Sequence, residues 1–213
     1  MTTPNIGRLH VITDEVLQTR LSHAEVAKLA LSGGADVIQY REKRALKARE
    51  LMAAAGAVAA ACREAGAICI VDDRVDVSAS VGANGVHLGR DDLDVSTARL
   101  LLGNPYLIGG TANSLDEARA VWRTPVDYIG VGPIFGTNSK ANPAPELGLD
   151  ALRAIAAESP VPVIAIGNIT VDRVADVLAT GAYGIAVLSG ITCAPDPEAA
   201  ARLYAAAIRG GSV

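Results

Sequence analysis

The sequence predicts a closed parallel (β/α)8 barrel, a TIM barrel, and three observations lead to that fold class. Short apolar segments rich in β-branched residues alternate with alanine-rich helical patterns eight times along the chain. Each apolar segment is a nearly continuous hydrophobic run, which is typical of strands covered by helices. The length, 213 residues, is near the small end for such a barrel and argues against an inserted domain. We expect one catalytic domain over residues 1–213.

The predicted strands each end at a polar or glycine-rich turn. Strands that alternate with helices require right-handed crossovers and a parallel sheet. Eight such units favour a closed barrel over an open, doubly wound sheet. In chain order the predicted strands are Leu9–Thr13, Asp36–Tyr40, Ile68–Asp72, Gly85–Leu88, Leu107–Thr111, Tyr128–Val131, Val163–Ile166 and Gly184–Val187.

The predicted helices have recognisable start and stop signals. Ser22 and Ser114 are expected N-caps, Gly33 and Gly66 are expected at C-terminal ends, and Pro197 is expected in a first turn. The helices are Ala24–Leu31, Lys47–Glu64, Val75–Val81, Ser96–Leu102, Leu115–Trp122, Asp150–Ala157, Asp172–Ala179 and Glu198–Ile208.

Composition and charge exclude several classes of partner. The chain is 50% hydrophobic but only 3% aromatic, which suits a barrel filled by Val, Ile and Leu. With a net charge of −4 and no long basic run, nucleic acid is not an expected partner. No apolar run reaches the roughly 18 residues of a membrane span, so we expect a cytoplasmic protein. Cys62, Cys69 and Cys193 form no Cys-x-x-Cys pair and are expected to be reduced.

The second predicted strand ends in a cationic stretch. Alternation along the strand points Gln39, Arg41 and Lys43 to one side and leaves Tyr40 and Glu42 on the other. An amide, a guanidinium and an ammonium that converge would bind phosphate or pyrophosphate oxygens. The alternative is a solvated basic turn.

Two pairs of carboxylates follow the third and fourth predicted strands. Asp72 and Asp73 end one strand, and Asp91 and Asp92 follow the next. Because the carboxyl ends of parallel strands meet at one end of a barrel, this arrangement suits Mg²⁺ held by carboxylates, phosphate oxygens and water. The alternative is helix capping by Asp72 or Asp73, and by Asp92 or Asp94.

Three loops supply further phosphate-binding candidates. After the sixth strand, a long loop carries two hydroxyls and the lysine of Thr137–Lys140, although it could be a simple crossover. After the seventh and eighth strands lie Gly167 and the stretch Val187–Gly190, where barrels commonly bind phosphate. Ordinary turns are the alternative there.

Histidine does not point to catalysis. None of His10, His23 and His87 has metal-cluster spacing or an obvious nucleophile partner, so each is expected to be structural or on the surface. Acyl transfer through a Ser-His-Asp or Cys-His site is therefore disfavoured.

Several motifs together resemble one known family. They are Gln39-Tyr40-Arg41-Glu42-Lys43, Asp72-Asp73-Arg74-Val75-Asp76, Gly85-Val86-His87-Leu88-Gly89 leading to Asp92, Tyr128-Ile129-Gly130-Val131-Gly132-Pro133-Ile134-Phe135, Thr137-Asn138-Ser139-Lys140 and Ile164-Ala165-Ile166-Gly167. Over nearly its whole length the chain resembles the thiamine phosphate synthase family.

The resemblance implies a transferase that joins hydroxymethylpyrimidine pyrophosphate to a thiazole phosphate, or its carboxylated form, and releases pyrophosphate. It implies one Mg²⁺ per subunit at Asp73 and Asp92 and phosphorylated small molecules as partners, and it is compatible with a homo-oligomer. Catalysis would be electrostatic, through Arg41, Lys43 and Lys140. The implied substrate-binding residues are Gln39, Tyr40, Arg41, Glu42, Lys43, Asp72, Thr111, Thr137, Asn138, Ser139, Lys140, Gly167, Val187 and Leu188.

Departures from the family pattern keep two alternatives open. Asp72 stands where the family usually has Asn, and Asn168 where it has a second Gly. A related barrel, the thiazole tautomerase, resembles this chain with a histidine in place of Pro133, but proline cannot move a proton and Asp73 and Asp92 are retained. The third interpretation is a non-catalytic barrel that binds a phosphorylated ligand.

Overall fold

Eight parallel strands close into a barrel in the computed structural model, which describes residues 6–136 and 144–210. Each strand pairs with its sequence neighbours, and β1 closes on β8 through the register Leu9↔Ile185. The predicted TIM barrel is confirmed. The strands are β1 (Leu9–Thr13), β2 (Val37–Tyr40), β3 (Ile68–Asp72), β4 (Gly85–Leu88), β5 (Leu107–Ala112), β6 (Tyr128–Val131), β7 (Val163–Ile166) and β8 (Gly184–Val187).

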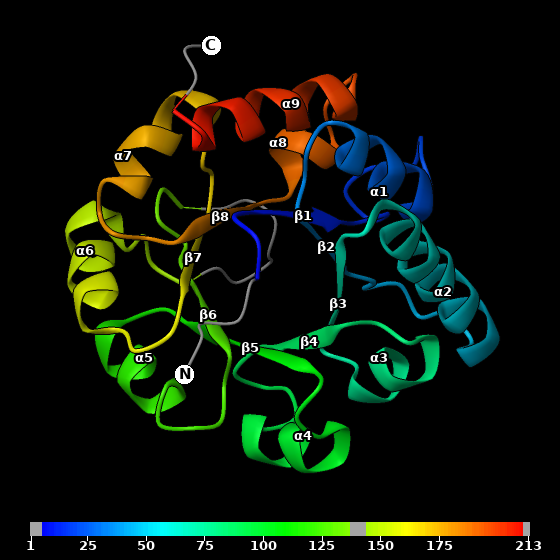
Figure 1. Ribbon diagram of the computed structural model, residues 1–213, viewed down its shortest axis with the longest axis horizontal. Helices are drawn as coiled ribbons and strands as arrows, with labels where there is room; N and C mark the ends of the chain where they lie inside the picture. Colours follow the sequence, from blue (N-terminus) through cyan, green and yellow to red (C-terminus); the bar gives the residue numbers. More distant parts are fainter. Residues whose placement is uncertain (1–5, 137–143, 211–213) are drawn as a thin grey trace.

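Helices form a ring around the strands, and α9 lies beside α1 and α8 where the chain completes the circle (Figure 1). Predicted and observed ends agree within two residues, except that the seventh helix begins as a 3₁₀ turn (Val171–Arg173), labelled η1, and that a short helix after β8 was not predicted. The helices are α1 (His23–Ser32), α2 (Ala48–Ala65), α3 (Val75–Val81), α4 (Val95–Leu102), α5 (Leu115–Val121), α6 (Gly148–Glu158), α7 (Val174–Leu178), α8 (Ser189–Thr192) and α9 (Pro197–Ile208).

The predicted cap residues explain where several helices begin and end. Ser22 accepts a hydrogen bond from the Glu25 N–H, and the Glu25 side chain accepts one from the Ser22 N–H, so α1 starts with a full capping box. Ser114 caps α5 by accepting from the Glu117 N–H. Gly66 ends α2 with φ 67°, a left-handed conformation that favours glycine. These caps set the first residue of α1 and α5 and the last residue of α2.

The hydrophobic core lies mainly between strands and helices, and a smaller cluster fills the barrel. Val11, Ile38, Val71 and Ile129 belong to the outer cluster. Ile12, Tyr128, Ile164 and Ala186 belong to the inner one. The inner cluster fills the barrel beneath its carboxyl-terminal end. Charged groups at that end therefore lie above an apolar layer of side chains.

The described cysteines are unpaired, as expected. Cys62 in α2 and Cys69 in β3 are buried, and Cys193 after α8 is exposed. The hydrogen bond with Cys69, and then burial, raise the pKa of the Cys62 thiol. Among the described residues, no helix has the length and apolar character needed to cross a membrane.

His10 is a buried titratable group within the barrel, 2% exposed, and its Nε2 has no hydrogen-bond partner. Its pKa is lowered to about 4 because burial disfavours the charged imidazole, although backbone groups of Gly7 and Ile6 and the charge of Asp36 oppose the shift. An unfolded histidine has a pKa of about 6.5. Between those values the unfolded state binds more protons, so the free energy of unfolding falls as the pH drops.

We therefore expect the protein to lose about 3 kcal/mol of unfolding free energy through His10 when the pH falls from about 7.5 to 4. The variant His10→Phe keeps a ring in the barrel but cannot titrate, so its loss over the same range should be smaller by that amount. Urea unfolding of both proteins at the two pH values measures the difference. Equal losses in the two proteins would show that His10 does not couple folding to protons.

Candidate active site

Charged side chains from the ends of β2 and β3 meet at the carboxyl-terminal end of the barrel. The Lys43 Nζ lies 3.2 Å from the Asp72 Oδ2 and contacts the Asp73 Oδ2. The Arg41 Nε lies 3.7 Å from the same Asp72 oxygen, and the Gln39 Nε2 donates to the Asp72 Oδ1 at 2.7 Å. Gln39, Arg41 and Lys43 thus share one side, as the strand alternation predicted. Acids and bases are interleaved here on adjacent strand ends.

A buried carboxylate after β1 anchors the arginine. Asp14 is 1% exposed and accepts the backbone N–H groups of Val16 and Leu17 at 2.7 and 3.0 Å. Its other oxygen contacts Arg41 Nη1. Asp14 directly follows β1, and no pattern in the sequence assigned it a role. Its position holds the guanidinium above the barrel rather than in solvent.

Two further carboxylates, Asp73 and Asp92, come together from the loops after β3 and β4. Asp73 has a left-handed backbone, φ 61°, and its N–H donates to the His87 carbonyl at 2.9 Å. Asp92 accepts the Gly89 N–H at 2.7 Å and is hydrogen-bonded to the Asp73 carboxyl. A left-handed non-glycine residue is uncommon and is often found at functional sites. The two acids meet because the β3 and β4 ends are adjacent.

The electrostatics of this acid pair favour a cation. Burial raises the pKa of Asp92, and the hydrogen bond and charge of Asp73 raise it further against the opposing Gly89 N–H. Burial also raises the pKa of Asp73, but the hydrogen bond and charge of Lys43 outweigh this and hold that pKa below its usual value. Two carboxylates in contact repel each other when both are ionised, and a divalent ion removes that repulsion.

The capping alternative does not account for these acids. The N-cap of α3 is Arg74, which makes no side-chain cap bond. The N-cap of α4 is Asp94, whose carboxylate accepts the Thr97 N–H at 3.0 Å. Asp73 and Asp92 are therefore not used as caps. Within residues 6–136 and 144–210, no three His, Cys, Asp or Glu side chains are grouped so that they could hold a metal ion.

Tyr40 and Glu42 face away from the charged groups. The Tyr40 ring is 1% exposed and packs edge-on against His23 at 4.6 Å between ring centroids. The Glu42 side chain is 3% exposed, lies 3.2 Å from the His23 Nε2 and pairs with Arg44. The structure thus gives no support to the prediction that these two side chains bind substrate, because strand alternation turns them toward α1.

The end of β5 contributes the predicted hydroxyl of Thr111. Its Oγ1 lies 2.9 Å from the His87 Nε2, and the His87 Nδ1 lies 3.2 Å from the Tyr128 hydroxyl. His87 is half-buried in β4 rather than on the surface. The sequence offered no signal for this contact, because a lone histidine in a four-residue strand does not reveal its partners in other strands.

The loop after β7 packs against the loop after β6, where the Phe135 N–H donates to the Gly167 carbonyl at 3.2 Å. Gly167 has φ 114°, and a Cβ there would lie 2.5 Å from the Cα of Pro133, so only glycine fits. Asn168 adopts the left-handed conformation, φ 48°, which asparagine tolerates. Val187 ends β8 and Leu188 is the N-cap of α8. The predicted residues Thr137, Asn138, Ser139 and Lys140 lie outside the described part of the chain.

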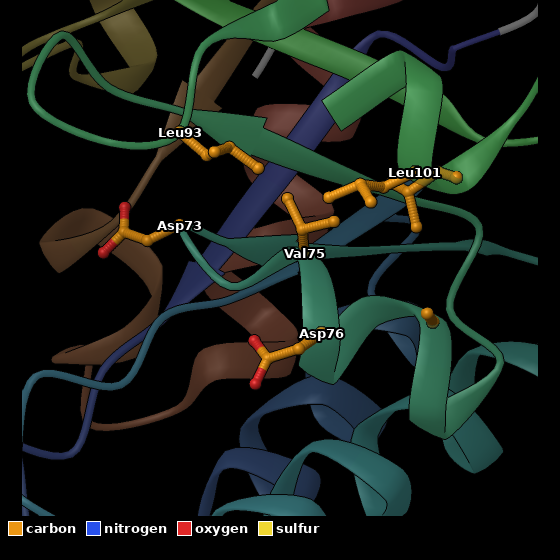
Figure 2. A pocket seen from close by; sticks show the side chains of 7 residues that line it. Asp73, Val75, Asp76, Leu93 and Leu101 are labelled. Atoms are coloured by element: carbon orange, nitrogen blue, oxygen red, sulfur yellow. The ribbon is translucent and has the colours of Figure 1, made fainter. Parts of the chain in front are cut away.

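An apolar hollow of about 450 Å³ opens beside Asp73. In Figure 2 the Asp73 carboxylate points away from Val75 and Leu101, which line the hollow. Apolar walls cannot satisfy phosphate oxygens. This hollow is therefore not a candidate for binding phosphate oxygens.

Comparison with known proteins identifies the family. The family model described as thiamine monophosphate synthase matches residues 9–191. The chain belongs to this family. It is 47% identical over 206 residues to thiamine-phosphate synthase of Salinibacter ruber, covering 97% of this chain and 90% of the relative. It is 45% identical over 197 residues to thiamine-phosphate synthase of Methanospirillum hungatei, covering 92% and 95%.

Solved structures agree with this assignment to the synthase family. Thiamine phosphate pyrophosphorylase from Pyrococcus furiosus superimposes with a TM-score of 0.88 at 35% identity, covering 97% of both chains. A 3-hexulose-6-phosphate synthase superimposes with a TM-score of 0.66 at 20% identity, covering 94% of this chain and 99% of that one, a likeness of fold alone.

Proposed function

We propose that this member of the synthase family is a cytoplasmic thiamine-phosphate synthase whose residues 1–213 form one catalytic domain. It would condense 4-amino-2-methyl-5-hydroxymethylpyrimidine pyrophosphate with 4-methyl-5-hydroxyethylthiazole phosphate, or its carboxylated form, and release pyrophosphate. The observation that carries the proposal is the convergence of Arg41 and Lys43 on the carboxylates of Asp72 and Asp73. The activity named for relatives at 45–47% identity supports the same reaction.

The proposed roles of the cations follow from where charge develops. Breaking the bond between the pyrimidine methylene carbon and oxygen leaves negative charge on the departing pyrophosphate. Lys43 and Arg41, preorganised by Asp72 and Asp14, would stabilise that charge, together with Lys140, which follows β6 in the sequence. The electron-rich pyrimidine carries the matching positive charge, and the thiazole nitrogen then attacks the methylene carbon. This chemistry needs no protein nucleophile.

Asp73 and Asp92 are the proposed ligands for one Mg²⁺. The repulsion between these two carboxylates when both are ionised fits a metal site that pyrophosphate oxygens and water complete, and the contact of Asp73 with Lys43 places a cation beside it. When bound, the ion would neutralise charge on the leaving group. In this proposal Gln39 and Asp72 help to form the pyrophosphate-binding side of the site. The Thr111 hydroxyl donates a hydrogen bond to the pyrophosphate.

The thiazole phosphate is proposed to bind at the loops after β7 and β8. Gly167 leaves room for close approach of its backbone, and Val187 and Leu188 lead into the start of α8. Backbone N–H groups at such loops commonly bind phosphate in barrels. Thr137, Asn138 and Ser139 remain proposed contacts on the same phosphate.

The two alternative functions predict different products. The tautomerase alternative requires a proton-transfer group at Pro133, which has none, and a non-catalytic barrel gives no reason for paired acids beside cations. Mixing the two phosphorylated substrates with Mg²⁺ and following pyrophosphate and thiamine phosphate separates these functions. We expect both products in equal amounts. Isomerised thiazole without pyrophosphate would indicate the tautomerase, and tight ligand binding without either product would indicate the non-catalytic barrel.

A further inference from the structure

Three polar side chains from consecutive strands form a continuous chain inside the barrel. The Tyr128 hydroxyl in β6 lies 3.2 Å from Nδ1 of His87 in β4, and the His87 Nε2 lies 2.9 Å from the Thr111 Oγ1 in β5. Tyr128 is 2% exposed, whereas Thr111 is partly exposed at the strand end. The Tyr128–His87–Thr111 chain therefore runs from the buried barrel interior to the candidate site.

Two glycines make room for this chain. A Cβ on Gly109 in β5 would lie 2.5 Å from the His87 Nδ1 and 2.5 Å from the Tyr128 hydroxyl oxygen. A Cβ on Gly130 in β6 would lie 2.9 Å from the His87 Cε1. Any larger residue at either position would displace the imidazole, because such short approaches are not found between real side chains. The absence of side chains at Gly109 and Gly130 thus allows the His87 and Tyr128 rings to lie next to each other.

The hydrogen bonds in this chain can run in only one of two directions. A neutral imidazole donates from one nitrogen and accepts at the other. If the Tyr128 hydroxyl donates to Nδ1, then Nε2 carries the proton and donates to the Thr111 oxygen. The Thr111 proton is then free to donate elsewhere. In the opposite direction, the Thr111 hydroxyl donates its only proton to the His87 Nε2. It can then only accept hydrogen bonds from groups in the site.

The nature of the ligand selects the first direction. Pyrophosphate oxygens bound to a divalent ion accept hydrogen bonds and have no proton to offer, so Thr111 must donate to bind them. Tyr128 can serve as the donor, since burial, followed by the charges of Asp72 and Asp127, raises the pKa of its hydroxyl and keeps it protonated.

We propose that Tyr128 is a positioning residue that fixes His87 as the Nε2–H tautomer and thereby turns the Thr111 hydroxyl into a donor for a pyrophosphate oxygen. The inference rests on the proposed function, because that function supplies the pyrophosphate to which Thr111 would donate. It adds a specific role for a buried tyrosine that does not itself touch substrate.

A double-mutant cycle on thiamine phosphate formation tests this inference. Tyr128→Phe keeps the ring and removes the donor, and Thr111→Val keeps the shape and removes the hydroxyl. Each should lower kcat/KM for the pyrimidine pyrophosphate about tenfold, the effect of losing one hydrogen bond to a charged group. The double variant should lose no more than either single one. Tyr183→Phe, a change of the same size at the opposite end of the barrel, is the matched control.

Losses that multiply in the double variant would overturn the inference, because Tyr128 would then act independently of Thr111. So would an unchanged kcat/KM in Tyr128→Phe while Thr111→Val is impaired. Unfolding midpoints of all variants separate these outcomes from loss of folded protein.

Nitrogen NMR of the ligand-free protein tests the tautomer without any turnover. The chain has 3 histidines, so the His87 signals can be assigned by comparison with His87→Gln. We expect a protonated Nε2 and an unprotonated Nδ1 in the wild type, and a mixture of tautomers in Tyr128→Phe. A protonated Nδ1 in the wild type would refute the inference. If the wild type makes no thiamine phosphate but shows the Nε2–H tautomer, the proposed function fails while the tautomer assignment stands.

Discussion

Asp73→Asn is expected to lower thiamine phosphate formation by roughly 10³-fold or more, and excess chelator should do the same to the wild type, because a bound metal supplies several kcal/mol of charge stabilisation. Asp73 is one of two carboxylates that contact each other at the ends of β3 and β4. An amide at this position would keep the size but remove the charge that holds the ion. The measurement is steady-state product formation across a Mg²⁺ titration.

Asp94→Asn is the matched control for this prediction. Asp94 lies in the loop after β4 that also holds Asp92, but it caps α4 through the Thr97 N–H, and asparagine caps a helix equally well. This variant should retain full activity and the same response to Mg²⁺. Undiminished turnover of the wild type in excess chelator would contradict the role given to Asp73 and Asp92.

The strands could be predicted almost to the residue because each is a short β-branched run that ends at a polar or glycine turn. β1, β3, β4, β6, β7 and β8 were predicted with their observed bounds. The exception among the helices is α8, whose four residues, Ser189–Thr192, are too few to show a helical period. Its formation depends on contacts with β1 and α9, and the sequence does not display these.

Only the parts of the site that follow from strand alternation and strand order could be predicted from the sequence. Alternation placed Gln39, Arg41 and Lys43 on one side of β2, and parallel order placed Asp72 nearby. The pairing of Arg41 with Asp14 depends on how far a flexible side chain reaches across to β1, which no periodicity encodes. The same limit applies to contacts across the barrel interior.

The structure also shows how Asp72 is accommodated beside Asp73. One Asp72 oxygen accepts the Gln39 amide and the other lies near Lys43 and Arg41. Burial, and then the charge of Asp73, raise the pKa of Asp72 to about 6, while both cations oppose the shift. The extra carboxylate is therefore offset by groups already present at the site.

Lys43→Ala is expected to lower kcat on the order of 10²-fold, the magnitude of losing one preorganised group that stabilises transition-state charge. Lys43 is the cation in contact with both Asp72 and Asp73, so its ammonium lies beside one of the proposed metal ligands. Lys43→Ala is also a better test of this role than a substitution of Arg41. Removing the arginine would leave Asp14, 1% exposed, without its partner, and breaking such a buried pair costs about 3–5 kcal/mol of stability.

Lys47→Ala in the same segment provides the matched control, because Lys47 is exposed at the start of α2 and its side chain makes no cap bond. That variant should turn over at the wild-type rate. Single-turnover pyrophosphate release, measured with saturating substrates, isolates the chemical step from binding. Because Lys43 is 37% exposed, its loss should leave the unfolding midpoint in urea nearly unchanged. A decrease of less than threefold in Lys43→Ala, with the fold intact, would mean that the leaving group is stabilised elsewhere.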